Sequence, residues 1–195
     1  MKSVIFSSLI IGAAAFAPSH TSRTTSALQA DITSEVGAQA PLGYFDPAGI
    51  AGDPTAADQA EFDRRRYIEL KHGRVAMLAV VGYLTTYAGV RFPGAEDIPA
   101  GFAALSAVPG MVWAQMIATW GMMEAANRDF TGLGEFPGDF RNGALDFGWD
   151  KQSDAWKKNK RSIELNNGRA AQMGIFGLMV HDLMGNVGDI LPLAN

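Results

Sequence analysis

The sequence contains no cysteine and is poor in charged residues. The absence of cysteine excludes disulfides, thiolate nucleophiles, iron–sulfur clusters and structural zinc held by cysteine. Charged residues make up 18% of the chain, against about 25% in an ordinary soluble domain, while 48% of the residues are hydrophobic. The formal net charge of -4 leaves no basic surface of the kind that DNA or RNA binding requires. This composition favours a membrane protein with no nucleic-acid partner.

Motifs of common enzyme classes are also missing. Neither an HExxH nor a GxSxG pattern occurs, and the whole chain has 3 histidines. The run GLGEFPG from Gly132 superficially resembles a glycine-rich nucleotide loop, but Pro137 interrupts it and no βαβ unit surrounds it. We therefore expect the protein not to be an enzyme.

The N-terminal segment has the composition of targeting sequence. Lys2 precedes an apolar run and then Ala13–Ala15, the layout of a secretory signal peptide whose apolar core is too short to span a bilayer. The following stretch is rich in Ser and Thr and has Arg23 but no acidic residue before Asp31, as is typical of a plastid transit peptide. We predict a signal peptide over residues 1–15, a transit peptide over 16–30 and the mature domain over 31–195. The alternative is a plain secretory signal with a tail.

Three stretches carry helical apolar patterns, separated by connections rich in Gly, Pro and Asp. They run from about Glu61 to Val90, from Pro109 to Arg128 and from Ser162 to Met184. Each uncharged run is shorter than the roughly 20 residues of a simple transmembrane helix. The lengths suffice if charged residues at the starts of the first and third helices lie in the membrane, where charges need partners. The run Lys157–Arg161 is predicted to be a solvated charge cluster on the stromal side.

An internal repeat accounts for those charges. RYIELKHGRVA from Arg66 aligns with RSIELNNGRAA from Arg161 at a constant offset of 95, and coincidence is a poor account of that match. The first and third helices are therefore predicted to be two copies of one unit. We expect an all-α membrane protein with three transmembrane helices, the first and third forming a crossed pseudo-twofold pair.

Crossing of the first and third helices also explains how the Glu and Arg charges can pair. Arg74 lies about 140° around its helix from Glu69, so the two are badly placed to pair with each other. Two crossed copies allow Arg74 to pair with Glu164 and Arg169 to pair with Glu69. Small residues that would let the crossing backbones approach closely are Gly73, Gly82, Gly168 and Gly177.

Single nitrogen and oxygen ligands remain once the charges are paired. Each paired Glu keeps a lone pair, while His72 offers an imidazole nitrogen and Asn167 an amide oxygen. His181 lies roughly 21 Å further along the third helix than Asn167, on nearly the same face. Magnesium takes such ligands, and a magnesium already held by a macrocycle needs one axial ligand from the protein.

On these residues the chain resembles the light-harvesting chlorophyll-binding family, and within it the fucoxanthin–chlorophyll a/c-binding proteins. The likeness rests on Glu69-x-x-His72-x-Arg74, on Glu164-x-x-Asn167-x-Arg169 and on the loop Gly43-Tyr44-Phe45-Asp46-Pro47. The string AAAFAP around Phe16 adds to it, because it resembles the bipartite presequences of algae whose secondary plastids belong to the red lineage. The doubled motif is highly specific, whereas the loop alone is weak.

The resemblance implies an antenna protein that binds chlorophyll a, chlorophyll c, fucoxanthin and other xanthophylls. The residues that it implies as ligands of chlorophyll magnesium are Glu69, His72, Gln115, Glu124, Glu164, Asn167 and His181. It implies that Arg74 and Arg169 compensate the charge of the opposite Glu. Gln115 and Glu124 are nine residues apart, against eight in the green lineage, which leaves the partner of Glu124 open, with Arg128 as a local candidate. Carotenoid end groups are expected near Asp46-Pro47 and Asp146–Trp149.

The resemblance further implies a multi-pass protein of the thylakoid membrane in a secondary plastid. The expected partners are the core of photosystem I or photosystem II, other antenna subunits and thylakoid lipid. A photoprotective, energy-dissipating member of the same family is one alternative. A haem-binding electron-transfer protein using His72 and His181 is another, but it leaves the repeat of Glu and Arg unexplained. A colourless three-helix scaffold explains the ion pairs but not the unpaired ligands.

Overall fold

The computed structural model describes residues 32–50, 59–130, 132, 134–142 and 146–191. These residues form helices and connections and contain no β-strand, which confirms the all-α expectation. Both predicted targeting segments lie outside the described residues. The helices are η1 (Ile32–Ser34), α1 (Gln59–Tyr87), α2 (Ala103–Ala107), α3 (Gly110–Ala126), η2 (Trp149–Lys151), α4 (Asp154–Met184) and α5 (Val187–Ile190).

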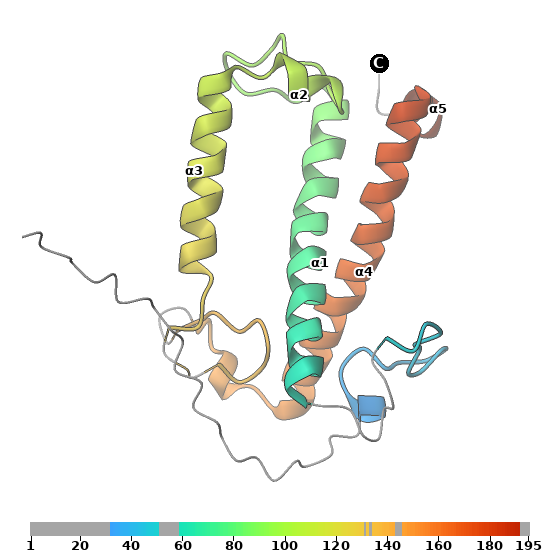
Figure 1. Cartoon of the computed structure of the whole chain (residues 1–195), viewed down its shortest axis with the longest axis vertical. Coiled ribbons are helices and arrows are strands. Elements are labelled where there is room, and N and C mark those ends of the chain that lie inside the picture. Colours follow the sequence, from blue (N-terminus) through green and yellow to red (C-terminus); the bar gives the residue numbers. More distant parts are fainter. Residues whose placement is uncertain (1–31, 51–58, 131, 133, 143–145, 192–195) are drawn as a thin grey trace, which may run out of the picture.

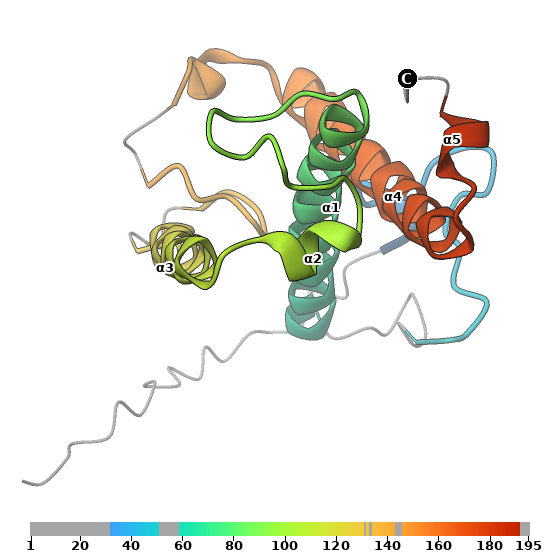
Figure 2. The same ribbon diagram turned by 90° about the horizontal axis from the view of Figure 1, so that it is seen from above.

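Two long helices, α1 and α4, run in the same direction and cross, while α3 runs antiparallel to α1 and stands apart from the crossed pair (Figures 1 and 2). The connection that carries α2 joins α1 to α3 at one end of the molecule. The segment that carries η2 joins α3 to α4 at the opposite end, beside the start of α1. The crossing therefore lies next to the connection between α3 and α4.

The three main helices differ in length. α1 has 29 residues and α4 has 31, which correspond to about 43 and 46 Å at 1.5 Å per residue. α3 has 17 residues, or about 25 Å. In the described ranges, no helix combines the length and the hydropathy that mark a membrane-spanning segment.

The predicted first and second helices agree with α1 and α3 to within three residues at each end, and Pro109 is the N-cap of α3. The third helix begins eight residues earlier than expected, at Asp154 instead of Ser162. Its cap explains the difference, because the Ser153 side chain accepts a hydrogen bond from the backbone N–H of Trp156. The helical apolar patterns in the sequence did not predict the short helices α2 and α5.

The early start of α4 places the run Lys157–Arg161 in a helix, where Lys158, Asn159 and Lys160 are exposed as expected and Lys157 and Arg161 are partly buried. These residues lie in the first two turns of α4. The Lys157 ammonium bonds the Glu135 carboxylate at 3.0 Å with its side chain 16% exposed, and the Arg161 guanidinium lies 4.3 Å from the ring centre of Phe136. Lys157 and Arg161 therefore link the preceding connection to the helix, while the rest of the run stays exposed.

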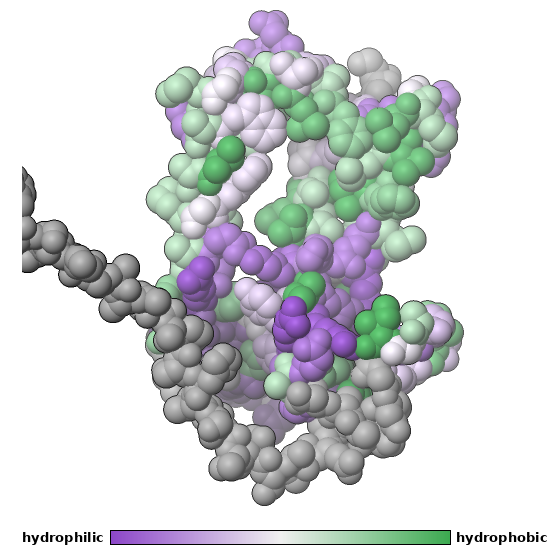
Figure 3. All heavy atoms as spheres, in the orientation of Figure 1, coloured by the Kyte–Doolittle hydropathy of each residue, from purple (hydrophilic) through white to green (hydrophobic). Residues whose placement is uncertain are grey.

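The buried core is small and sits beside the crossing, where Val36, Leu70 and Leu165 form one cluster. Hydrophilic side chains gather towards the end that contains the crossing, and hydrophobic ones cover much of the opposite half (Figure 3). Large apolar side chains that stand more than half exposed on the three main helices include Val75, Leu78, Met111, Ile117, Trp120 and Phe176. The outer faces of these helices are thus apolar and not covered by the described part of the chain.

Candidate functional site

The backbones of α1 and α4 touch at one pair of glycines. A Cβ atom placed on Gly73 would lie 2.9 Å from the Cα atom of Gly168, and one placed on Gly168 would lie 3.0 Å from the Cα atom of Gly73. Any side chain here would push the helices apart. The same role expected of Gly82 and Gly177 is wrong, because a Cβ atom at either meets nothing within 4 Å. The helices diverge beyond the crossing point, so their backbones no longer meet there (Figure 1).

Both inter-helix ion pairs that the repeat predicts are present. Arg74 Nε donates to Glu164 Oε1 at 2.7 Å, and Arg169 Nε donates to Glu69 Oε1 at 2.7 Å. The four side chains are 30–43% exposed. The crossing thus brings together the two motifs that lie far apart in the sequence.

Each arginine also bonds the connection that precedes the opposite helix. Arg74 Nη1 donates to the Gly138 carbonyl and Arg169 Nη1 to the Gly37 carbonyl, both at 3.0 Å. Both glycines have positive φ, +88° and +106°, a region that favours glycine. The pseudo-twofold relation therefore extends from the helices into the connections, where the sequence shows no repeat.

The surroundings of the two glutamates differ in one respect. Glu69 has a second cation, because Arg66 Nη1 donates to its Oε2 at 2.6 Å. Arg161, which aligns with Arg66, stacks on Phe136 and makes no ion pair with Glu164 among the described contacts. Oε2 of Glu164 is left with no hydrogen-bond partner in the described part of the chain.

Both histidines on the long helices present one ring nitrogen outward. His72 Nδ1 lies 2.8 Å from the Ile68 carbonyl oxygen, and His181 Nδ1 lies 3.0 Å from Asn186 Oδ1. Since these oxygens accept, Nδ1 carries the proton and Nε2 keeps its lone pair. His72 is exposed and His181 half-buried, and neither Nε2 has a partner among the described residues. Each imidazole therefore leaves Nε2 available as a single nitrogen ligand.

The amide candidates and Glu124 lie on exposed surface. Asn167 on α4 has no hydrogen-bond partner within the described ranges, and Gln115 on α3 is likewise exposed. The suggestion that Arg128 neutralises Glu124 is wrong, because Glu124 Oε2 instead contacts Lys71 Nζ of α1 at 2.5 Å. Gln115 and Glu124 lie on α3, away from the crossing, and His181 lies about 18 Å beyond Arg169 along α4.

A cavity lies beside each crossing glutamate. The cavity at Glu69 runs between η1, the following loop and the start of α1, and that at Glu164 runs between α4 and the connection from α3. Residues that line the first include Pro41, Tyr44, Phe62, Arg66 and Asn166. Residues that line the second include Phe140, Phe147, Trp149, Trp156 and Lys160. Both cavities combine aromatic rings with a carboxylate.

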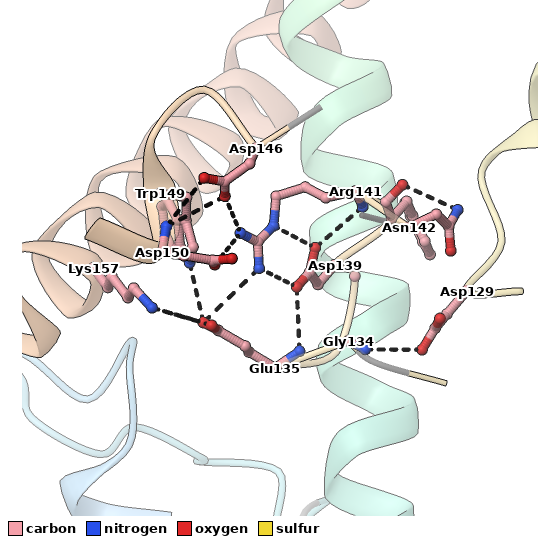
Figure 4. A network of polar contacts seen from close by, with 12 residues as sticks. Asp129, Gly134, Glu135, Asp139, Arg141, Asn142, Asp146, Trp149, Asp150 and Lys157 are labelled. Atoms are coloured by element: carbon pink, nitrogen blue, oxygen red, sulfur yellow. Dashed lines mark hydrogen bonds and ion pairs between the residues drawn. The ribbon is translucent and has the colours of Figure 1, made fainter. Parts of the chain in front are cut away.

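Arg141 organises the connection between α3 and α4 (Figure 4). It donates through Nε and Nη2 to both carboxylate oxygens of Asp139 at 2.9 and 2.7 Å, and through Nη1 to Asp146 and Asp150 at 3.0 and 3.2 Å. These bonds lower the pKa of Asp139 from 3.8 to about 2, although its burial opposes the shift. The bond from the Trp149 indole, followed by that from Lys157, also lowers the pKa of Glu135. The network fixes the loop that presents the Gly138 carbonyl to Arg74.

The donor set fits a magnesium that a macrocycle already holds and does not fit a bare ion. Nowhere in the described ranges do three or more His, Cys, Asp or Glu side chains converge as a metal site. The candidate ligands are instead single donors at separate positions on α1, α3 and α4. One axial ligand is what a magnesium macrocycle requires of the protein.

Sequence reasoning missed three contacts that position these helices: Arg66 with Glu69, Lys71 with Glu124, and a polar cluster at the far end of the crossed pair. In that cluster the Tyr87 hydroxyl donates to Asp182, whose other oxygen accepts from the backbone N–H of Phe102 at 2.7 Å. For that cluster, the only signal in the sequence is Asp182, an acidic residue next to His181 in an apolar run. That signal does not identify a partner.

Comparison with known proteins agrees with this geometry. Residues 32–183 match the family model described as chlorophyll A-B binding protein. The fucoxanthin-chlorophyll a-c binding protein A, chloroplastic, of Phaeodactylum tricornutum is 55% identical over 195 residues, covering 95% of this chain and 97% of the relative. A protein with the same binding description from Trieres chinensis is 50% identical over 197 residues, covering 95% and 96%. One from Macrocystis pyrifera is 47% identical over 175 residues, covering 84% and 78%. The chain belongs to the chlorophyll A-B binding protein family.

Proposed function

We propose that the protein is a light-harvesting antenna that binds chlorophyll a, chlorophyll c and fucoxanthin and passes excitation energy to a photosystem. The observation that carries the proposal is the crossing of α1 and α4, where two inter-helix ion pairs lie on the same helices as single donors that have no partner in the described part of the chain. Bound chlorophyll supplies the light absorption and excited states. The protein fixes the distance, orientation and local polarity of the pigments. The proposed role involves no bond-making step and is not enzymatic.

We assign magnesium ligation to the donors that the geometry leaves open. On the crossed helices these are Glu164 Oε2, Nε2 of His72 and His181, and the amide oxygen of Asn167, together with a remaining lone pair of the Glu69 carboxylate, whose two oxygens already accept from Arg169 and Arg66. Arg74 neutralises Glu164, and Arg169 together with Arg66 balances Glu69, so that neither carboxylate is an unpaired charge. Gln115 and Glu124 are the ligands proposed for α3.

The cavities beside Glu69 and Glu164 suit the end groups of carotenoids. Their linings combine aromatic rings with polar groups from the connections that precede α1 and α4. A long polyene has an apolar middle and polar ends, so it matches an apolar helix face that terminates in such a cavity. We place fucoxanthin, and other xanthophylls where present, along these grooves.

We further propose that α1, α3 and α4 cross the thylakoid membrane of a secondary plastid. The lengths of α1 and α4 exceed the roughly 30 Å of a bilayer core, and apolar side chains stand exposed along all three helices. Bound pigment and lipid would cover those faces. The antenna role implies association with a photosystem, and we propose the core of photosystem I or II, other antenna subunits and thylakoid lipid as partners.

An absorption spectrum of the full chain reconstituted with extracted pigments tests this function. We expect chlorophyll Q bands and energy transfer from fucoxanthin to chlorophyll a in the fluorescence excitation spectrum. A haem Soret band after purification from the native membrane, or a colourless product from both preparations, would contradict the proposal.

The targeting proposal has its own test. A fluorescent protein fused behind residues 1–40 should enter the plastid, and the motif around Phe16 should mark that route. We expect Phe16→Ala to abolish import and leave the fusion outside the plastid. Unchanged import of the variant would argue against the division into residues 1–15 and 16–30.

A further inference from the structure

In the part of the chain that the structure describes, one ion pair joins the helix α3 to the crossed pair. None of its residues is buried, and Figure 2 shows it apart from α1 and α4. Over the described ranges, the pair between Lys71 Nζ and Glu124 Oε2 is the only hydrogen bond or ion pair from α3 to either long helix. The side chains of Lys71 and Glu124 are 41% and 54% exposed. In water such a pair would contribute little, but beside a helix with an apolar surface each charge needs a partner.

Lys71 points away from the crossing. Gly73, which touches α4, lies about 160° around the helix from Lys71. The lysine thus projects from the face of α1 opposite to α4, and it precedes His72 directly. Arg128, in contrast, lies beyond the end of α3 at Ala126 and makes no bond with Glu124 in the described contacts.

The ion pair sets which faces of α1 and α3 are turned to each other. From Lys71, the residues one and two turns further along α1 on the same face are Val75 and Leu78. From Glu124, the residues one and two turns back along α3 are Trp120 and Ile117. Because the two helices are antiparallel, both stripes run from the ion pair towards α2 (Figure 1). Their side chains are 51–70% exposed, so the stripes do not pack on each other.

The two apolar stripes lie on the sides of α1 and α3 that carry the ion pair, and the described part of the chain leaves them exposed. Oε2 of Glu124 is taken by Lys71, and Oε1 has no partner in the part of the chain that the structure describes. We propose that Lys71 is the counter-ion of Glu124, that the pair fixes α3 against α1, and that it leaves Oε1 of Glu124 as the ligand of a magnesium macrocycle. This proposal rests on the pigment-binding function above and adds Lys71 as its positioning residue.

The test reconstitutes the full chain with extracted pigments and compares charge-altering variants. Lys71→Met removes the counter-ion and should cost one chlorophyll per chain relative to carotenoid, with a change in the visible circular dichroism. Lys71→Arg keeps the charge and should retain that chlorophyll. Arg128→Met is the matched control and should behave like the unmodified chain. Combining Lys71→Met with Glu124→Gln removes the orphan charge but keeps an oxygen ligand, so it should recover the chlorophyll.

The outcomes separate this proposal from the function on which it rests. If the unmodified chain takes up no pigment, the proposed function fails. If the unmodified chain is pigmented and Lys71→Met keeps every chlorophyll, or if Arg128→Met loses one instead, the role of Lys71 is overturned while the function stands. A Lys71→Met chain that does not assemble is judged by the double variant, whose failure to recover any pigment would also overturn the role.

A second readout needs no pigment. A zero-length carbodiimide joins an ammonium and a carboxylate that are in contact, forming an amide with loss of water. Applied to the unpigmented full chain in detergent, it should link the peptide that contains Lys71 to the peptide that contains Glu124, as detected by mass spectrometry. Arg128→Met should leave the yield of this link unchanged, whereas Glu124→Gln should abolish it. Absence of the link in both pigmented and unpigmented chains would overturn the pairing.

Discussion

The crossing has two halves, one around Glu69 and one around Glu164, which share one motif but differ in how the glutamate is neutralised. Glu69 is held by Arg169 from the opposite helix and by Arg66 from its own, at 2.7 and 2.6 Å. Among the described residues, Glu164 is held by Arg74 alone at 2.7 Å, since Arg161 turns to the ring of Phe136. The repeat therefore determines the ion pair between the helices in each half. The neighbouring connections determine whether the glutamate has a second arginine.

That difference has consequences for robustness. Glu69 keeps a cation if its inter-helix partner is lost, whereas Glu164 does not. Glu164 in return has an oxygen without a partner among the described residues, which suits ligation, and its half depends on the loop that Arg141 holds. The Glu69 half thus has two cations for one carboxylate, whereas the Glu164 half depends on the folded connection between α3 and α4.

Removal of Arg74 should have the largest effect. Arg74→Leu leaves Glu164 unmatched, which costs up to about 3–5 kcal/mol for a fully buried pair and less for this one, whose side chains are 34% and 31% exposed, and pigmented reconstitution should fail. Arg169→Leu should cost less, about 1.5–3 kcal/mol, because Arg66 remains on Glu69. The yield of pigmented complex and its thermal denaturation measure the ranking.

The double change Arg74→Leu with Glu164→Gln serves as the control, because it removes the orphan charge. It should recover part of the pigmented complex. Equal losses in the Arg74 and Arg169 variants, or no recovery in the double change, would contradict the asymmetry between the halves.

The glycine contact shared by both halves should come next. Gly73→Ala places a methyl group against the backbone of Gly168 and should destabilise the complex by about 1–3 kcal/mol. Gly82→Ala is the matched control on the same helix, because its Cβ atom meets no neighbour, and it should be neutral or slightly stabilising. Chlorophyll release on heating reports both. Similar behaviour of the two variants would show that the backbones do not touch at Gly73.

Acid should weaken the Glu164 half selectively. The pKa of Asp139 is lowered in the folded protein, from 3.8 to about 2, so its contribution of about 2 kcal/mol is complete above pH 4 and is lost as the pH falls towards 2. Hydrogen exchange of residues 134–142, corrected for the intrinsic pH dependence, should accelerate across that window. Asp139→Asn should exchange faster at neutral pH and lack the transition. A pH-independent rate in the unmodified chain would refute the role of this carboxylate.

The smallest effect should come from His181, which lies away from both halves. His181→Leu removes one nitrogen ligand and leaves no charge unpaired, so the complex should fold and lose one chlorophyll, with a localised loss in the red absorption band. His181→Gln, which offers an oxygen, should restore much of that band. An intact His181→Leu complex with unaltered pigment stoichiometry would remove His181 from the ligands.

The sequence by itself determined the helices and the inner contacts of the crossing. The repeat at a fixed offset required two equivalent helices, and the helical period placed Glu69 and Arg74 too far apart around α1 to pair within it. On two crossed copies, each Glu can then pair with the Arg of the opposite helix. Local periodicity and charge balance were sufficient because both are properties of the helix itself.

Only the tertiary structure decided the second cation at each glutamate, the partner of Glu124 and the point where the backbones meet. Lys71 and Glu124 lie 53 positions apart and share no motif, and Gly82 matches Gly177 in the repeat yet meets nothing. These contacts depend on where helices diverge and how connections fold between them. Such distances are set by the packing of the whole chain, and no local pattern encodes them.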